Sequence, residues 1–137
     1  MTGAELSLEG LNAVLSTEEF MAVRDAASGV RVAPEVIDYA VRLVSATREG
    51  AAIETGSGPR GSLALIRCAR GKALMERRDF VIPDDVKTLA VPVLAHRIGL
   101  SAESELEGLT EAQAVEALVA GIEAPRVDFQ GSIKGEA

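Results

Sequence analysis

The segment GSGPRGS, residues 56–62, holds the residue types and the spacing that most suggest chemistry in this 137-residue chain. Gly56 and Gly61 occupy the two glycine positions of the phosphate-binding pattern GxxxxGK[ST]. Ser62, however, stands where the phosphate-binding lysine belongs, and Leu63 stands where the magnesium-binding hydroxyl belongs. No hydrophobic strand is expected in front of these glycines. We therefore expect that the chain does not hydrolyse ATP by itself.

Arg60 is the residue of this segment with the clearest chemical potential. Gly58 and Pro59 precede it and are expected to open a helix sharply at this point. A cation in the first helical turn is unfavourable by about 0.3–1 kcal/mol, because the helix dipole is positive there. Free backbone N–H groups and a guanidinium could together bind a phosphate or a carboxylate. An exposed arginine that merely tolerates the small penalty is the alternative interpretation.

The charge distribution sets residues 60–78 apart from the rest of the chain. The chain carries a net charge of −7, which argues against general binding of nucleic acid. Residues 60–78 nevertheless carry +5, so the remainder carries −12. Such a positive island is compatible with a small anionic ligand, whereas solvated faces of one helix are the alternative. Arg67 lies two helical turns after Arg60 on the same side, and it is a supporting candidate with a solvated or intersubunit role as its alternative.

Composition predicts packed helices and excludes several kinds of site. The hydrophobic fraction is 47% while aromatic residues make up 3%, so the core must consist of Leu, Val, Ile and Ala. One cysteine, Cys68, and one histidine, His96, exclude an internal disulfide and a structural zinc site. We expect Cys68 to fill the core, His96 to be structural, and Asp84–Asp85 to stabilise a first helical turn rather than bind metal. No signal peptide and no run of ~20 apolar residues is evident, so a cytoplasmic protein is expected.

Helix signals predict an all-α bundle of about five helices with at most a very short extended segment. Two capping boxes, Ser16–Glu19 and Thr110–Gln113, and first-turn prolines at 34 and 83 mark helix starts. The predicted helices run from about 16 to 27, 34 to 50, 60 to 77, 83 to 99 and 110 to 125. Residues 50–59 are expected to form a loop, and Pro92 is expected to kink the fourth helix. The organisation predicted is a connector over 1–12, a helical domain over 13–126 and a flexible tail over 127–137.

Five blocks of the sequence are informative when taken together: VLSTEEF (14–20), DYAVRLVSATR (38–48), GSGPRGSLAL (56–65), RRDFVIPDDVK (77–87) and VLAHRIGL (93–100). In their order and spacing they resemble the C-terminal helical lid of MoxR-type AAA+ ATPases. The resemblance implies that Arg60 is the second-sensor arginine, which reaches the γ-phosphate of ATP held by a preceding α/β domain. Gly58, Pro59 and Arg67 are then candidate supporting residues, and no catalytic residue is expected in this chain alone.

The sequence departs from the MoxR pattern in two local places and one large one. The family usually reads closer to GASPRA, where this chain has Ser57, Gly58 and Gly61 around Pro-Arg. Ile82 replaces the threonine that commonly caps the next helix, so a cap is expected to be lost. The P-loop domain is missing from the sequence, and we therefore expect a piece of a longer protein.

The resemblance also implies cofactors and partners for that longer protein. ATP and Mg²⁺ are expected there, with neither bound by this piece alone. Expected partners are its own N-terminal AAA+ core domain, neighbouring subunits of a ring that is commonly hexameric, and a protein with a von Willebrand A domain. Chaperone-like remodelling or metal insertion is the implied duty, without nucleic acid or membrane.

Two other interpretations remain open at this point. The stretch DFVIPDDVKTLA (79–90) resembles the loop that leads into the last helix of histone folds, which would make the chain a non-enzymatic interaction module. That module would dimerise and could contact DNA, although the acidic balance opposes DNA and the GSGPR element would have no role. The other interpretation is a stand-alone regulator that has lost its motor domain.

Overall fold

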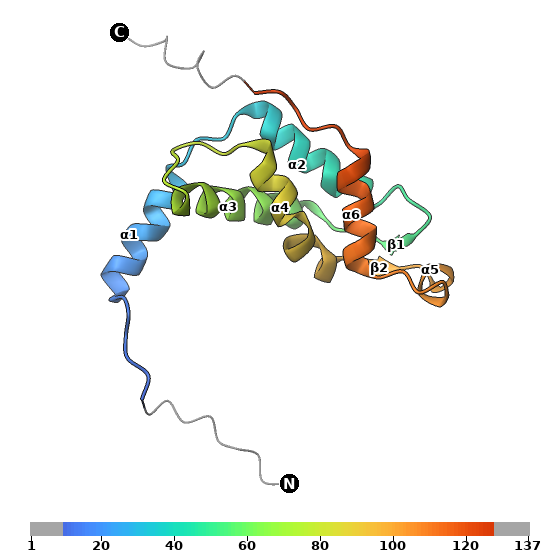
Figure 1. Ribbon diagram of the computed structural model, residues 1–137, viewed down its shortest axis with the longest axis horizontal. Helices are drawn as coiled ribbons and strands as arrows, with labels where there is room; N and C mark the ends of the chain where they lie inside the picture. The colour runs from blue at the N-terminus through green and yellow to red at the C-terminus, as the bar shows by residue number, and fades with distance from the viewer. Residues whose placement is uncertain (1–9, 128–137) are drawn as a thin grey trace.

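The computed structural model describes residues 10–127, which form a mostly helical bundle with one very small sheet (Figure 1). The predicted all-α class is confirmed. The helices are α1 (Thr17–Ser28), α2 (Pro34–Ala46), α3 (Pro59–Met75), α4 (Pro83–Leu94), α5 (Ala102–Leu106) and α6 (Glu111–Gly121), with a 3-10 turn η1 (Ala95–Arg97) after α4. The strands are β1 (Ile53–Thr55) and β2 (Gly99–Leu100).

The core lies among α2, α3 and α4, and α6 packs against α4 and contributes the buried Val115. Aliphatic side chains fill it almost entirely, as the low aromatic content predicts, and Tyr39 is the one aromatic residue buried in it among residues 10–127. The hydrophobic residues of these three helices with no exposed surface are Val36, Tyr39 and Ala40 of α2, Leu65, Ala69 and Ala73 of α3, and Val86 and Ala90 of α4. Burial raises the pKa of the Tyr39 hydroxyl, although the nearby Arg42 opposes that shift.

The buried side of α3 differs from the one that hydrophobicity predicts. The sequence has two adjacent strips of helical spacing, one with Leu63, Ile66, Arg70 and Leu74 and one with Leu65, Cys68 and Ala69. Leu63 of the first strip is 57% exposed. The buried residues instead repeat every four positions at Gly61, Leu65, Ala69 and Ala73. The reason is that three of these four are small, which lets the backbones of α2 and α4 approach α3 closely, and a hydrophobicity pattern gives small residues little weight.

The predicted capping box opens α1, but the apolar side of this helix is not buried. The Glu19 carboxylate accepts a hydrogen bond from the Ser16 amide at 2.7 Å, and the Ser16 hydroxyl accepts one from the Glu19 amide at 3.1 Å. The predicted packing side of Phe20, Val23 and Ala27 lies largely in solvent, with Phe20 59% and Val23 51% exposed. Local capping therefore defines α1, whereas packing within residues 10–127 does not cover it.

Two connecting segments are more regular than the sequence indicates, and the fourth helix is shorter. The predicted loop 50–59 contains β1, which pairs antiparallel with β2 and places Ile53 opposite Leu100. The predicted polar loop before the last helix contains the short helix α5. The fourth helix ends at Leu94, contains Pro92, and continues as η1 rather than running to Gly99. Strands of two or three residues are too short to leave a periodic signal.

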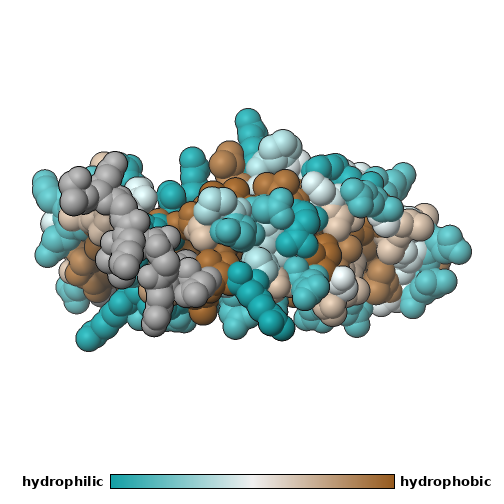
Figure 2. All heavy atoms as spheres, turned by 90° about the horizontal axis from the view of Figure 1, so that it is seen from above, coloured by the Kyte–Doolittle hydropathy of each residue, from teal (hydrophilic) through white to brown (hydrophobic). Residues whose placement is uncertain are grey.

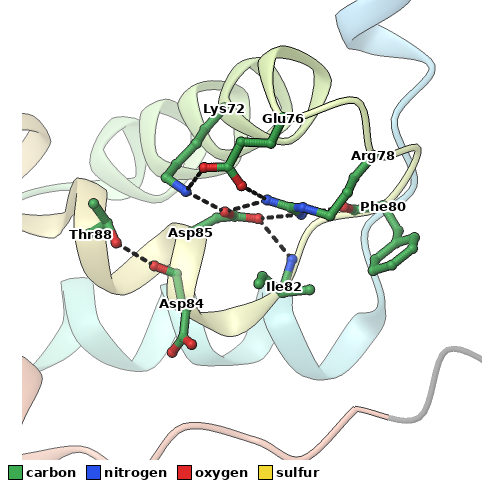
Figure 3. Close-up of polar contacts among 8 residues, drawn as sticks. All are labelled: Lys72, Glu76, Arg78, Phe80, Ile82, Asp84, Asp85 and Thr88. Atoms are coloured by element: carbon green, nitrogen blue, oxygen red, sulfur yellow. Dashed lines mark hydrogen bonds and ion pairs between the residues drawn. The ribbon is translucent and has the colours of Figure 1, made fainter.

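A buried carboxylate fastens the end of α3 to the start of α4 (Figure 3). Asp85 is fully buried and accepts hydrogen bonds from Arg78 at 2.8 and 2.9 Å and from Lys72 at 3.0 Å. It also accepts a hydrogen bond from the Ile82 amide at 2.9 Å, so Asp85 supplies one of the two hydrogen bonds of a capping box. Isoleucine has no side-chain oxygen that could accept the other. Glu76 contacts both Lys72 and Arg78, each at 2.6 Å.

The ionisation of this cluster follows from its contacts. Burial alone would raise the pKa of Asp85, but hydrogen bonds from Arg78, the Ile82 amide and Lys72 outweigh it and hold that pKa below the ordinary value. Hydrogen bonds from Arg78 and Lys72 lower the pKa of Glu76. Hydrogen bonds to Glu76 and Asp85 raise the pKa of Lys72. The cluster is therefore fully ionised at neutral pH.

The described residues include little of the two predicted terminal segments. Most of the connector predicted over 1–12, and all but one residue of the tail predicted over 127–137, lie outside the described residues. Within residues 10–127, every helix is too short or too polar to span a bilayer.

Candidate functional site

The loop that leads into α3 is pinned to the end of α2. The Ser57 amide donates to the Thr47 hydroxyl at 2.9 Å, and that hydroxyl donates in turn to the Val44 carbonyl at 2.6 Å. Arg48 donates to the Ser57 carbonyl at 2.5 Å. Thr47 and Ser57 are both buried. These contacts fix where α3 starts and hence where Arg60 is placed.

The two glycines that imitate a phosphate-binding loop have a packing role instead. A Cβ atom at Gly56 would lie 2.6 Å from the Thr47 carbonyl oxygen and would overlap the Arg48 side chain. A Cβ atom at Gly61 would overlap the Ser57 hydroxyl and lie 3.2 Å from Leu94. The spacing of the two glycines therefore reflects close contacts between the loop, α2 and α4, and the similarity to a P-loop is coincidental.

Gly58 and Pro59 start α3 as predicted. Gly58 is the N-cap residue and Pro59 is the first residue of the helix. Gly58 has an ordinary extended backbone with φ −84°, and an added Cβ would meet nothing within 4 Å. Space and backbone conformation therefore do not require glycine at position 58, whereas proline at 59 suits a first helical position.

Arg60 is exposed at the second position of α3 and forms no hydrogen bond or ion pair with any residue from 10 to 127. No side chain caps α3, and no acidic residue lies in its first turn. The guanidinium and the helix N-terminus therefore add two positive contributions at one place, without an internal counter-charge from the described part of the chain.

A depression of roughly 540 Å³ beside α3 gathers three arginines. It is lined by Arg60, Leu63, Ala64, Arg67, Cys68 and Arg97. Arg60 and Arg67 thus share one surface, as their spacing predicts, and Arg97 joins them from η1, where it donates to the Val93 carbonyl at 3.1 Å. No carboxylate lines the depression, so its electrostatics favour an anion.

Two residues of this depression differ from what the sequence suggests. The sequence did not identify Arg97 as a candidate, because the position of Arg97 depends on the 3-10 turn after α4. The only indication in the sequence was a basic residue near the predicted end of the fourth helix. Cys68 was expected to fill the core but is exposed. It lies one residue before Ala69 of the buried strip, and one residue turns a helix by about 100°.

The remaining polar candidates are not assembled into a metal site. His96 is exposed in η1. Asp84 is 76% exposed and lies 3.6 Å from Lys87, while its neighbour Asp85 is taken up by the cluster that joins α3 to α4. Among residues 10–127, no group of three or more His, Cys, Asp or Glu side chains could hold a metal ion.

A comparison with known protein families agrees with this helical fold. The family model described as the AAA lid domain matches residues 45–118, more than half of the chain. The chain belongs to the AAA lid domain family. The match includes residues 79–90, so the lid family accounts for the stretch on which the histone-fold interpretation was based.

Similar proteins identify the lid as the MoxR type. Chaperone MoxR1 of Mycobacterium tuberculosis is 30% identical over 124 residues, which cover 84% of this chain and 33% of that protein. Protein MoxR of Paracoccus denitrificans is 37% identical over 87 residues, 54% of this chain and 26% of that protein. The uncharacterized protein YeaC of Bacillus subtilis is 34% identical over 118 residues, 86% of this chain and 37% of that protein.

A solved structure agrees with these relatives. The crystal structure of a predicted ATPase from Cytophaga hutchinsonii superposes with a TM-score of 0.76 at 29% identity, and the match covers 80% of this chain and 36% of that one. The chain thus spans about a third of the length of the proteins it matches. The resemblance to a MoxR-type lid is confirmed.

Proposed function

We propose that this lid serves a MoxR-type AAA+ ATPase and that Arg60 senses the nucleotide. The observation that carries the proposal is that the Arg60 guanidinium has no hydrogen-bond or ion-pair partner among residues 10–127, at the start of a helix whose preceding loop is hydrogen-bonded to the end of α2. A cation held in a fixed place without a counter-ion is suited to a polyphosphate presented by another domain.

ATP and Mg²⁺ would be held by the AAA+ core domain that precedes a lid in this family. The donor set at Arg60 suits a phosphate. Residues 10–127 contain no group of three or more His, Cys, Asp or Glu side chains that could hold a metal ion, so this proposal places the Mg²⁺ ligands in that core domain. ATP supplies the phosphoryl group that is transferred to water. Arg60 would donate hydrogen bonds to the terminal phosphate and stabilise the negative charge that develops on it.

The other residues of the depression would support Arg60 without touching the phosphate. Pro59 and the hydrogen bonds of Ser57 fix the direction in which α3 begins. Arg67 and Arg97 would raise the positive potential near Arg60 and so draw an anion toward it. Because the lid is a separate packed unit, contact between Arg60 and the phosphate would move it as a rigid body.

The relatives' names support the wider role. One is named a chaperone and one solved structure is described as an ATPase. We therefore assign the longer protein a chaperone-like remodelling role in the cytoplasm. Its partners would be its own AAA+ core, neighbouring subunits of a ring and a protein with a von Willebrand A domain.

The test is ATP turnover of the longer protein with Arg60→Ala. Loss of one charge-stabilising donor should lower kcat by about 10²–10³-fold. Arg60→Lys should restore only part of the rate, because lysine keeps the charge but lacks the planar fork. Arg126→Ala, which removes another exposed arginine, is the matched control and should leave kcat unchanged.

Folding must be measured on the same variants. Arg60 is exposed and forms no hydrogen bond or ion pair within residues 10–127, so Arg60→Ala should change the free energy of unfolding of the lid by less than about 0.5 kcal/mol. A normal turnover rate in Arg60→Ala would remove the nucleotide-sensing role and leave only the family assignment.

A further inference from the structure

Helix α1 contacts α3 but buries little of its own surface. It has 12 residues, none of them buried, and Ala27 alone is half-buried. An isolated helix of this length is marginal in water, and a cap contributes only about 1 kcal/mol. Phe20, Met21 and Val23 are 59%, 38% and 51% exposed. Figure 1 shows α1 projecting from one end of the bundle, and Figure 2 shows apolar residues at the surface of that end. Its apolar side chains are therefore largely exposed on the described part of the chain.

A second apolar surface lies between α2 and α3. It is a groove of roughly 570 Å³, whose apolar lining is Ile37, Val41, Val44, Pro59, Leu63 and Ile66. Ile37, Val41 and Leu63 are 43%, 44% and 57% exposed, which is unusual for large aliphatic residues brought together in one concave place. Its lining residues on α2 run from Ile37 to Ser45, about 12 Å at the helical rise per residue.

The charges of the groove and of α1 are opposite. Arg48 and Arg70 line the groove, and no carboxylate does. Arg70 has no hydrogen-bond or ion-pair partner among residues 10–127, and its Nε atom is buried there without an acceptor. The first turn of α1 carries Glu18 and Glu19, beside the exposed apolar residues of the same helix. Helix α1 is about 18 Å long, so it is long enough to cover the lining residues of α2.

We propose that α1 of one copy of this chain docks in the α2–α3 groove of a second copy. Phe20 and Val23 would cover the aliphatic floor, and the acidic first turn would face the arginines. The contact joins two different surfaces, so repetition around an axis builds a ring and repetition along a line builds a filament. This inference names the surfaces for the subunit contacts proposed above and does not depend on the role of Arg60.

Sedimentation velocity of the 137-residue chain over a range of concentrations tests the proposal. The unaltered chain should associate. Phe20→Glu, which alters α1, and Leu63→Glu, which alters the groove, should each weaken association by at least about 10-fold, because each buries an unpaired charge in an apolar contact. Leu106→Glu, at a leucine of α5 that is 90% exposed, is the matched control and should associate normally.

Mixing the two altered chains distinguishes this contact from a symmetric one. Phe20→Glu keeps an intact groove and Leu63→Glu keeps an intact α1, so an equimolar mixture should form a 1:1 complex although neither chain associates alone. Circular dichroism checks that both variants keep their helices. A monomeric unaltered chain at every concentration, or a mixture that stays monomeric, would overturn the proposal and leave the AAA+ core as the cover of α1. Arg60→Ala should associate normally, which separates this test from that of nucleotide sensing.

Discussion

Replacing Asp85 by Asn tests whether the buried ionic cluster stabilises the junction of α3 and α4. The amide keeps the size of the carboxylate and one acceptor oxygen, but it removes the negative charge and turns an N–H group toward two cations. Breaking a buried ion pair from one side costs about 3–5 kcal/mol in general. Arg78 and Lys72 are 19% and 27% exposed and still have Glu76, so they can recover some solvation. We therefore expect Asp85→Asn to lower the free energy of unfolding by about 3 kcal/mol.

The measurements are urea denaturation and thermal denaturation, both followed by circular dichroism. A loss of about 3 kcal/mol is large beside a total of about 5–15 kcal/mol and should lower Tm by roughly 10–15 °C. Asp84→Asn is the matched control, because Asp84 is the adjacent acid, 76% exposed, with only Lys87 nearby at 3.6 Å. That variant should change stability by less than about 0.5 kcal/mol.

The same variant predicts a pH dependence. The pKa of Asp85 is lower in the folded chain than in the unfolded one, so its stabilisation is complete above the unfolded pKa of about 4. It is lost as the pH falls through the lower folded value. The stability difference between the unaltered chain and Asp85→Asn should therefore shrink in acid. Equal stability of Asp84→Asn and Asp85→Asn at neutral pH would refute the reasoning.

Three further predictions concern α3 and the loop before it. Gly61→Ala should destabilise the chain by about 1–3 kcal/mol in urea unfolding, because its Cβ would overlap the hydroxyl of the buried Ser57 and crowd Leu94. Gly71→Ala in the same helix has open space and should stabilise the chain by about 0.5–1 kcal/mol, and the opposite order of the two stabilities would contradict the packing argument. Thr47→Val should cost about 1–3 kcal/mol because a buried loop amide loses its acceptor, while Thr88→Val on an exposed helix face should be nearly neutral in the same assay. Cys68 should react with a thiol reagent in the native state about as fast as in urea, and labelling that requires denaturation would contradict its exposure.

Helix starts were the most predictable part of the fold. Ser16, Thr110, Pro34 and Pro83 act through contacts with residues at most four positions away, so the local sequence contains the whole interaction. The helices do begin at these signals. Helix ends were less predictable, since the second and fourth helices end three to five residues earlier than glycine positions suggest, at places set by packing rather than by a stop residue.

Features that depend on distant residues could not be read from the sequence. The buried strip of α3 contains glycine and alanine, which matter because small side chains let another helix pack closely against α3. Asp85 was expected to stabilise a first helical turn, and it does, but its ion pairs with Lys72 and Arg78 require knowledge of how the chain turns between α3 and α4.

The candidate site was predictable in part for the same reason. Arg60, Gly58 and Pro59 are consecutive, so their arrangement at a helix start is local and was predicted. Arg97 reaches the same depression from η1, far along the chain, and only the folded structure shows that proximity. The assignment of Arg60 to nucleotide sensing remains a prediction.

The uninterrupted course of α3 gives the lid a mechanical property. Its 17 residues span about 26 Å, from the loop pinned by Thr47 at one end to the ionic cluster of Asp85 at the other. Because both ends of α3 are held by hydrogen bonds, the helix can absorb little displacement within its own length. A displacement of Arg60 would therefore be transmitted along α3 to Asp85 in the first turn of α4.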